Sequence, residues 1–256
     1  MTSPKEIAGA MAKAVFADFD SEAATKLLAD DYIQHNPFVP TGAAPVLGLM
    51  PMLKESGIKA DVHRVFSEGN LVVFHSTYYN AKLFGGDTLV AFDVFRIQDG
   101  KVAEHWDNLQ PLSGPNPSGH TMTDGAAEVT DLDKTATNKK LVEDFVDTVL
   151  VKGDVDKIDQ FIASGSNYVQ HNPMVGDGAD FLKGAIAQMG LKYTAVRMAI
   201  AEGNFVLLAS EGVFGSETVQ VFYDLFRVAD GKIVEHWDVA APMPDAAAFK
   251  HENGKF

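Results

Sequence analysis

The sequence lacks cysteine, has few basic residues for its number of acidic ones, and contains no long apolar run. Without cysteine, its 256 residues can form neither disulfides nor thiolate metal sites, and they offer no cysteine nucleophile. The 21 Lys and Arg residues against 35 Asp and Glu residues give a formal net charge of -14. This charge argues against nucleic acid and anionic membranes as partners, because binding to phosphates depends mainly on Lys and Arg.

Neither a membrane span nor a signal peptide is predicted. No stretch of about 18 apolar residues could cross a bilayer, and the first twenty residues lack a basic start and an unbroken apolar core. The 46% hydrophobic and 22% charged residues are typical of a soluble globular protein. We therefore expect a cytoplasmic protein, long enough for one large domain or two of ordinary size.

Three motifs occur twice and in the same order. The segment "YIQHNP" (32–37) returns as "YVQHNP" (168–173), 136 residues later. The pairs "EGNLVVFHS" and "EGNFVLLAS", then "FDVFRIQDGKVAEHWD" and "YDLFRVADGKIVEHWD", follow with an offset that falls only to 131. A tandem duplication explains this order, so we predict a first domain at 1–112 and a second at 134–245. The segment 113–133, rich in Pro, Gly, Ser, Thr and Asp, is predicted to be a linker, and 246–256 a polar tail.

Each copy is predicted to begin with helices and to continue with strands. Apolar residues recur at helical spacing at the start of both copies, as in Ile7, Met11 and Val15. A second short helix leads into the "YIQHNP" motif, which we interpret as a helix end entering a turn. A third helix is expected near 46–56 and 179–189. Long strands with glycine-containing turns follow. Helices that precede antiparallel strands pack on one face of the sheet, which predicts an α+β fold.

Strand parity predicts which polar side chains meet. A three-residue turn in "IQDGK" would place Asp93 opposite His105, with Asp107 on the same face. With two-residue type I′ turns, Asp93 would instead face Trp106. The same turn geometry places Asp224 opposite His236 in copy two, with Asp238 alongside. It also places His63 opposite Val73, next to His75. The predicted concave face of copy one therefore consists of His63, His75, Asp93, His105 and Asp107, with His35 and Asn36 nearby.

Copy two keeps only part of this set. Its equivalent residues are His171, Asn172, Asp224, His236 and Asp238. Arg197 and Ala209 stand where copy one has His63 and His75. The two copies therefore share a scaffold and differ in chemistry.

Each half resembles the nuclear transport factor 2-like superfamily, which is also described as cystatin-like. The combination of "YIQHNP" with "DVFRIQDGKVAEHWD" is similar to the SnoaL-like polyketide cyclase branch, whose members are described as aldol-condensation enzymes. The resemblance implies two tandem cone-shaped domains, each with a curved antiparallel sheet packed against about three helices around a pocket. It also implies that the two domains form a pseudo-dimer within one chain.

The resemblance assigns roles residue by residue. An aspartate near the end of the last long strand is the general acid/base of SnoaL-like cyclases, which implies this role for Asp107 and Asp238. Ketosteroid isomerases of the superfamily have a catalytic aspartate where this chain has Asn36 and Asn172, and asparagine cannot abstract a proton. They also use an acid as an oxyanion donor at the position of Asp93 and Asp224.

The implied chemistry is an aldol cyclisation, in which a base removes a proton next to a carbonyl group. Asp107 is expected to be the base, His105 or His35 to orient it, and Asn36 or a protonated Asp93 to donate to the oxyanion. His63, His75, Tyr32 and Trp106 are the expected substrate-binding residues. No cofactor is expected.

Structural interpretations of the same residues stay open. The "QHNP" motif could simply form a turn, Asp93 and Asp224 could pair with Arg96 and Arg227, and Trp106 could belong to the core. Asp107 and Asp238 could likewise be structural. A zinc or iron site is a further alternative, for which the candidates are His35, His63, His75 and His105.

Three functional classes remain at the level of the sequence. The first is a small-molecule enzyme of the cyclase, aldolase-type lyase or isomerase class that acts on an apolar carbonyl substrate. The second is a non-catalytic binding protein for a hydrophobic ligand, and the third a metal-dependent hydrolase or lyase in copy one. The expected assembly is an intramolecular pseudo-dimer that is a monomer or forms a further homodimer.

Overall fold

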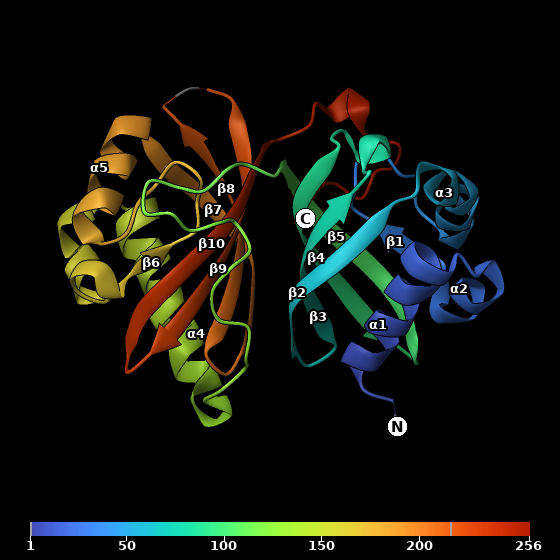
Figure 1. Ribbon diagram of the computed structural model, residues 1–256, viewed down its shortest axis with the longest axis horizontal. Helices are drawn as coiled ribbons and strands as arrows, with labels where there is room; N and C mark the ends of the chain where they lie inside the picture. The colour runs from blue at the N-terminus through green and yellow to red at the C-terminus, as the bar shows by residue number, and fades with distance from the viewer. Residues whose placement is uncertain (1, 216) are drawn as a thin grey trace. The chain divides into compact units, whose positions relative to one another are not determined.

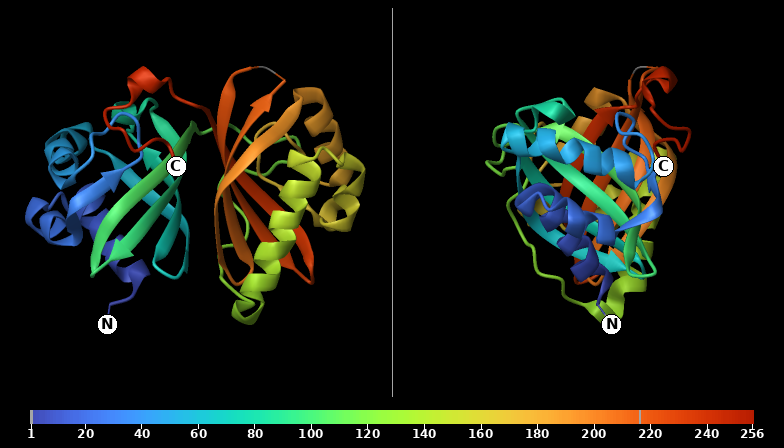
Figure 2. Two further views of the ribbon diagram at one scale, coloured as in Figure 1. Left: turned by 180° about the vertical axis from the view of Figure 1, so that it is seen from behind. Right: turned by 90° about the vertical axis from the view of Figure 1, so that its right-hand side faces the viewer.

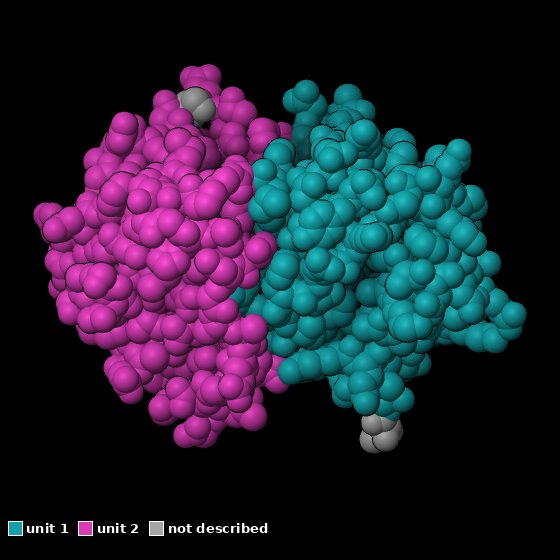
Figure 3. All heavy atoms as spheres, viewed as in Figure 1, with its two compact units in different colours: residues 1–112, 244–256 teal, residues 113–243 magenta. Residues whose placement is uncertain are grey.

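The computed structural model describes residues 2–215 and 217–256 (Figure 1). The chain forms two compact units, coloured separately in Figure 3. Unit 1 comprises Met1–Leu112 together with Pro244–Phe256, and unit 2 comprises Ser113–Met243. The predicted tail therefore belongs to unit 1, and the predicted linker belongs to unit 2. In the described part of the chain, no helix has both the length and the apolar character needed to cross a membrane.

Unit 1 begins with a helical layer and ends with a meander of strands. Its helices are α1 (Pro4–Lys13), which continues as a π-helical turn η1 (Ala14–Asp18), α2 (Ser21–Leu27) and α3 (Ala43–Ser56). Its strands are β1 (Leu28–Gln34), β2 (Lys59–Glu68), β3 (Leu71–Tyr79), β4 (Thr88–Gln98) and β5 (Lys101–Pro111), with a 3₁₀ turn η2 (Lys82–Phe84) before β4. A capping box between Ser3 and Glu6 starts α1.

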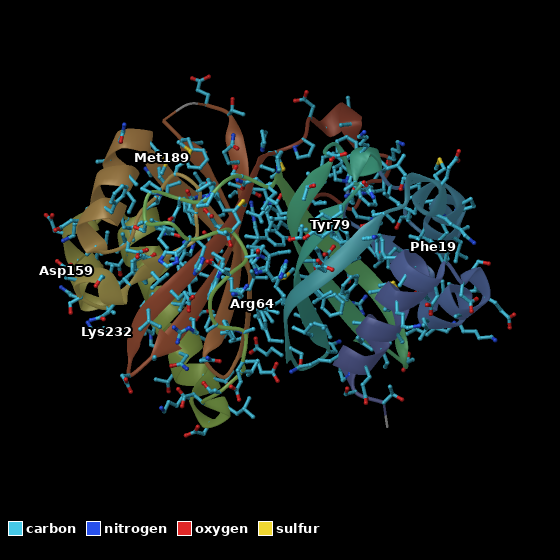
Figure 4. The ribbon with its side chains drawn as sticks, in the orientation of Figure 1. Phe19, Arg64, Tyr79, Asp159, Met189 and Lys232 are labelled. Atoms are coloured by element: carbon cyan, nitrogen blue, oxygen red, sulfur yellow. The ribbon has the colours of Figure 1, made fainter. Side chains whose placement is uncertain are left out.

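Unit 2 repeats this order with shorter second-helix and first-strand elements. The helical elements are η3 (Leu132–Lys134), α4 (Thr135–Phe145), η4 (Val146–Val151), η5 (Val155–Gln160), η6 (Gly165–Asn167) and α5 (Ala179–Met189). The strands are β6 (Val169–Gln170), β7 (Leu191–Glu202), β8 (Phe205–Phe214), β9 (Val219–Ala229) and β10 (Lys232–Pro242). A last 3₁₀ turn, η7 (Ala246–Ala248), lies in unit 1. The Lys232 ammonium of β10 donates to the carbonyl oxygen of Asp159 in η5 at 3.1 Å; both residues are labelled in Figure 4.

Each unit has one five-stranded sheet with helices on one face (Figures 1 and 2). The strand orders are β1-β5-β4-β3-β2 and β6-β10-β9-β8-β7. Neighbouring long strands are antiparallel, and among the described strands only β1 and β6 run parallel to their neighbours. Apolar side chains of the helices and of the facing sheet surface form one core in each unit. The predicted α+β fold with two tandem domains is therefore confirmed.

The "YIQ" part of the repeated motif is a strand, and its interpretation as a helix end is wrong. Gln34 pairs with His105 of β5 in parallel register, and the His35 amide donates to the His105 carbonyl oxygen at 3.0 Å. Tyr32 and Gln34 are buried on alternate positions, as a strand on a covered sheet requires. The motif thus leads from an edge strand into the loop before α3.

The hairpin after β4 also differs from the expected three-residue turn. Asp99 and Gly100 both have positive φ, 51° and 77°, and Gln98 pairs with Lys101, which is the two-residue arrangement of a type I′ turn. A bulge at Ala103 then adds one residue to β5, so that Asp93 lies opposite Asp107. The expected pairing of Asp93 with His105 is wrong, but the bulge restores parity and all three side chains share one face.

Unit 2 contains the same correction. Asp230 and Gly231 have positive φ, 49° and 72°, a bulge follows at Val234, and Asp224 lies opposite Asp238 rather than His236. The bulge occurs in both units and turns Asp107 and Asp238 toward the same face of their sheets.

The predicted placement of His63 and His75 on the concave face is wrong. A bulge at His63 makes Arg64, labelled in Figure 4, the partner of His75. His75 in turn lies opposite Phe92, the neighbour of Asp93 that points to the other face of the sheet. Both histidines therefore face away from the helical layer, where their rings lie 5.8 Å apart.

Candidate active site

Unit 1 encloses an apolar pocket between its helices and its sheet. The cavity, called here the first pocket, has a volume of about 80 Å³, several times the volume that one water molecule needs. Its polar lining consists of Tyr32, Gln34, Asn36, Tyr78, Asp93, His105 and Asp107. Its apolar lining consists of Met11, Val15, Phe16, Val39, Val46, Leu49, Leu53, Phe84, Phe95 and Leu109. A few polar groups converging in an apolar cavity are typical of small-molecule sites.

His105 is held between two acceptors. Its Nδ1 lies 3.0 Å from Gln34 Oε1, and that oxygen also accepts the backbone N–H groups of His35 and Asn36, at 3.0 and 2.9 Å. Because Gln34 Oε1 is an acceptor in all three contacts, His105 Nδ1 donates. His105 Nε2 lies 3.1 Å from Asp93 Oδ1, so the imidazole bridges Gln34 and Asp93.

Asp107 has three polar neighbours. Asn36 Nδ2 donates to Asp107 Oδ2 at 2.6 Å, and Asn36 Oδ1 accepts the Phe38 amide, so the asparagine both forms the turn and fixes the aspartate. Lys255 Nζ donates to Asp107 Oδ1 at 3.1 Å and to the Asp107 carbonyl oxygen at 2.6 Å. Burial alone would raise the pKa of Asp107, but Lys255, His105 and Asn36 together hold that pKa below its usual value.

Unit 2 encloses an equivalent second pocket of about 50 Å³. Its polar lining consists of Tyr168, Gln170, Asn172, Tyr193, Asp224, His236 and Asp238. His236 Nδ1 donates to Gln170 Oε1 at 2.8 Å, and His236 Nε2 lies 3.0 Å from Asp224 Oδ1. Burial lowers the pKa of His236, but the carboxylates of Asp224 and Asp238 outweigh burial and raise it.

Asp238 differs from Asp107 in its partners. Asn172 Nδ2 donates to Asp238 Oδ2 at 2.7 Å, as Asn36 does in unit 1. Asp238 Oδ1, however, is buried without a hydrogen-bond partner among residues 2–215 and 217–256. Burial raises the pKa of Asp238, Asp224 adds to the increase, and His236 and Asn172 offset only part of it.

In each unit a buried tyrosine hydroxyl donates to the aspartate on the strand before the last, Asp93 or Asp224. The two tyrosines come from different strands. Tyr78 of β3 donates to Asp93 at 2.9 Å, whereas Tyr193 of β7 donates to Asp224 at 2.8 Å. Tyr78 lies opposite Ala60 in unit 1, and Tyr193 lies opposite Gly212 in unit 2. The tyrosine and the small residue have thus exchanged strands while the hydroxyl has stayed at the carboxylate.

His35 and Trp106 do not line the first pocket. The two rings stack at 4.8 Å, and His35 Nε2 contacts Glu104 at 2.9 Å on the sheet face away from the helices. In unit 2, His171 and Trp237 stack at 4.6 Å in the same way. Of the residues predicted for copy one, the structure brings together Tyr32, Asn36, Asp93, His105 and Asp107, while His35, His63, His75 and Trp106 lie elsewhere.

The residues missed by the sequence analysis are Gln34 with Gln170, Tyr78 with Tyr193, and Lys255. The glutamines stand inside the repeated motif, so the repeat itself was a usable signal. The tyrosines occupy non-equivalent positions of the two copies, which hides them from a comparison of the repeats. Lys255 lies in the predicted polar tail, where no pattern marks it.

The expected pairing of Asp93 with Arg96 is also absent from the described contacts of Arg96. Arg96 Nε binds Glu104 Oε2 at 2.6 Å, and Arg227 binds Glu235 at the same distance. The pocket aspartates are therefore not neutralised by these arginines.

The four histidines predicted as metal ligands do not converge, because three of them face away from the pocket. A tighter group, Asp93 with His105 and Asp107, has donor atoms within 4.8 Å of one another. In this group His105 Nδ1 donates to Gln34 Oε1, which leaves Nε2 as the ring nitrogen that faces the Asp93 carboxylate.

Comparison with known proteins identifies the family. The model of the SnoaL-like domain matches residues 10–105 and 142–236, which together cover most of the chain. The chain therefore belongs to the SnoaL-like family and contains two tandem nuclear transport factor 2-like domains. No curated protein matches the sequence.

Several solved structures are similar to one domain of this chain. IdmH from Streptomyces antibioticus, provisionally assigned as a polyketide cyclase, is 20% identical, with 42% of this chain and 92% of that chain covered and a TM-score of 0.36. An LEH-like epoxide hydrolase of M. tuberculosis is 17% identical, with coverages of 42% and 82% and a TM-score of 0.35. A provisionally assigned ketosteroid isomerase from Kribbella flavida DSM 17836 is 18% identical, with coverages of 49% and 90% and a TM-score of 0.37.

Proposed function

We propose that this protein is an acid-base enzyme that removes a proton next to the carbonyl group of a small apolar compound, as aldol-type cyclases and lyases do. The observation that carries the proposal is the unpartnered Oδ1 of Asp238, buried in an apolar pocket. A free aspartate is a weak base at neutral pH, with a pKa of about 3.9, and burial makes it stronger. The raised pKa of Asp238 supports this role.

The sequence put Asp107 first as the base, and the structure favours Asp238. Asp107 already binds the Lys255 ammonium, so its carboxylate is less basic. Asp238 Oδ2 accepts from the side-chain amide of Asn172. We therefore assign proton abstraction to the second pocket.

The remaining groups of the second pocket supply the other parts of the reaction. Asp238 Oδ1 takes the α-proton, and the electrons of the broken C–H bond move to the carbonyl oxygen, which forms an enolate. Tyr168 Oη accepts from Gln170 Nε2 at 3.3 Å, which leaves its own hydrogen for that oxygen. The enolate carbon then attacks a second carbonyl group, and the protonated Asp238 returns the proton to the new alkoxide.

The test uses α-proton exchange, which needs no knowledge of the natural substrate. Cyclohexanone in D₂O is incubated with the protein, and deuterium incorporation at the α-carbon is followed by NMR. We expect Asp238→Asn to slow exchange by about 10²- to 10⁴-fold, the usual contribution of a positioned base, and Asp107→Asn to have a smaller effect. The exposed Asp156→Asn is the matched control in unit 2. Exchange at the wild-type rate in Asp238→Asn would refute the assignment.

The first pocket supports a second candidate function, ligand binding without turnover. The first pocket is the larger of these two cavities, and its Asp107 is ion-paired with Lys255. Under this proposal, Asp238→Asn still binds the ketone in the first pocket. Isothermal titration of that variant, with and without Leu53→Trp to fill the first pocket, tests it, and equal binding by both variants would contradict it.

A further inference from the structure

Two segments that follow the last strand of a copy cover the "QHNP" corners of the pockets. In unit 2 the segment 113–126, which follows β5, is the covering segment. Its Asn116 Nδ2 donates to the Gln170 carbonyl oxygen at 2.5 Å, and the Thr121 carbonyl oxygen binds His171 Nδ1 at 2.8 Å. The predicted linker is thus a packed part of unit 2.

In unit 1 the covering segment is the C-terminal segment Pro244–Phe256, which follows β10. Asn253 Nδ2 donates to the Gln34 carbonyl oxygen at 2.9 Å, the counterpart of the Asn116 contact. The Gly254 carbonyl oxygen accepts from His35 Nδ1 at 3.0 Å, the counterpart of the Thr121 contact. His251 Nε2 donates to the Asn36 carbonyl oxygen at 2.9 Å. Two sequences without similarity therefore satisfy the same groups of the two corners.

One difference between the two segments concerns charge. The C-terminal segment brings the Lys255 ammonium to Asp107, and the side chains of both residues are at most 7% exposed. The segment 113–133 contains neither Lys nor Arg, so it has no equivalent cation to offer Asp238. Because a buried ion pair holds its carboxylate ionised and reduces its affinity for a proton, the two aspartates differ in basicity.

We propose that Lys255 is a positioning residue that keeps Asp107 from acting as a base, so that the C-terminal segment restricts proton transfer to the second pocket. This inference rests on the proposed function and specifies how the two copies divide it. The other groups facing Asp107 do not distinguish the copies, because His105, Asn36, Asp93 and Tyr32 have the equivalents His236, Asn172, Asp224 and Tyr168.

The first experiment measures Asp107 directly and needs no substrate. The carboxyl carbon of Asp107 is followed by ¹³C NMR over pH in the full-length protein, with Asp107→Asn used to assign the signal. We expect Lys255→Met to move the titration midpoint of Asp107 upward, Lys255→Arg to keep it low, and Lys250→Met to leave it unchanged. Lys250 is the matched control, because it lies in the same segment and its side chain is exposed. An unchanged midpoint in Lys255→Met would overturn the inference.

The second experiment tests whether Asp107 acts as a base once the Lys255 ammonium is removed. In the Asp238→Asn background, we expect Lys255→Met to raise the α-deuterium exchange of cyclohexanone by about tenfold or more, and Lys250→Met to have no effect. A raised midpoint without recovered exchange would overturn the role of Lys255. If the wild-type protein shows no exchange, the proposed function fails, and the NMR midpoint then decides separately whether Lys255 sets the basicity of Asp107.

Discussion

Asp107 and Asp238 stand at the same position of the last strand and differ in one neighbour. Both are bound by an asparagine amide, but only Asp107 has a lysine ammonium beside it. The pKa of Asp107 is lowered and that of Asp238 is raised. A group with a shifted pKa makes stability depend on pH, so the two residues should affect folding in opposite directions.

Substituting the two aspartates should therefore change the free energy of unfolding with opposite sign. The lowered pKa of Asp107 stabilises the fold above the unfolded value of about 3.9, and this stability is lost as pH falls through the folded pKa. The raised pKa of Asp238 stabilises the fold below about 3.9, and that contribution is lost as pH rises through the folded pKa. At pH 7 we expect Asp107→Asn to destabilise and Asp238→Asn to stabilise the protein, each by on the order of 1 kcal/mol.

Urea unfolding between pH 3 and pH 7 measures both effects. The difference between each variant and the wild type should shrink toward the acidic end, as the carboxyl groups become protonated. Effects of the same sign at pH 7 would contradict the assigned environments.

The tyrosine hydroxyls give a second prediction for single residues. Tyr78 and Tyr193 reach equivalent carboxylates from non-equivalent strands. Tyr193→Phe removes one hydrogen bond to a buried carboxylate, which costs on the order of 2 kcal/mol. Urea unfolding should show this loss, and Tyr79→Phe, at an exposed position, is the control. A loss equal to that of the control would show that the hydroxyl does not hold Asp224.

At the level of the elements, the β-bulges determine which side chains enter the pockets. A type I′ turn alone would place Asp93 opposite Trp106. The extra residue at Ala103 shifts the register by one, so that Asp107 lies opposite Asp93 on the pocket face. The bulge at Val234 does the same in unit 2. Two compensating features thus place Asp107 and Asp238 in their pockets.

The covering segment of unit 2 can be tested through its glycines. Gly125 has φ 90°, and a Cβ there would lie 2.1 Å from Glu235 Oε1 and 2.9 Å from Trp237. Gly119 has nearly the same φ, 89°, but open space around it. Gly119→Ala should cost roughly 1 kcal/mol for the backbone alone, and we expect Gly125→Ala to cost clearly more in thermal unfolding. Equal costs would mean that the segment does not pack as described.

Local patterns predicted much of the fold, and long-range contacts were missed. The helical spacing of Ile7, Met11 and Val15 correctly predicted a buried helix. Parity placed His105 and Asp107 on one face, but the pairing was wrong because no residue type marks the bulge at Ala103. The strand β1 escaped prediction because its partner β5 lies some seventy residues further along.

In the candidate site, too, the residues in repeated motifs were predicted and a long-range contact was missed. Asn36, His105 and Asp107 belong to motifs that repeat, which made them candidates before their contacts were known. Lys255 lies 148 residues from Asp107 in the sequence and in no motif. Only the folded chain reveals that the two side chains meet.

For the molecule as a whole, each unit is completed by a segment that follows the last strand of the other copy. Unit 1 includes Pro244–Phe256, and unit 2 includes the residues that follow Leu112. The copies are consequently not two self-contained halves of the sequence. A cut after Asp133 would separate both pockets from their covering segments.

Truncation after Met243 should therefore affect unit 1 selectively. We expect the amides of β1 and β5 to lose protection in hydrogen exchange, because the contacts of Asn253 and Gly254 with Gln34 and His35 are removed. The amides of β6 and β10 should keep their protection. Lys255→Met in the full chain separates loss of the charge from loss of the segment, and equal loss of protection in both units would contradict the prediction.

The position of Lys255 also has a consequence for protein synthesis. N-terminal domains usually fold first while the ribosome is still translating. Here the domain made first receives its covering segment from Pro244–Phe256, which are translated after unit 2. Until Lys255 has been translated, Asp107 has no ammonium beside it, so the nascent first domain carries an aspartate without the ion pair that it has in the folded protein.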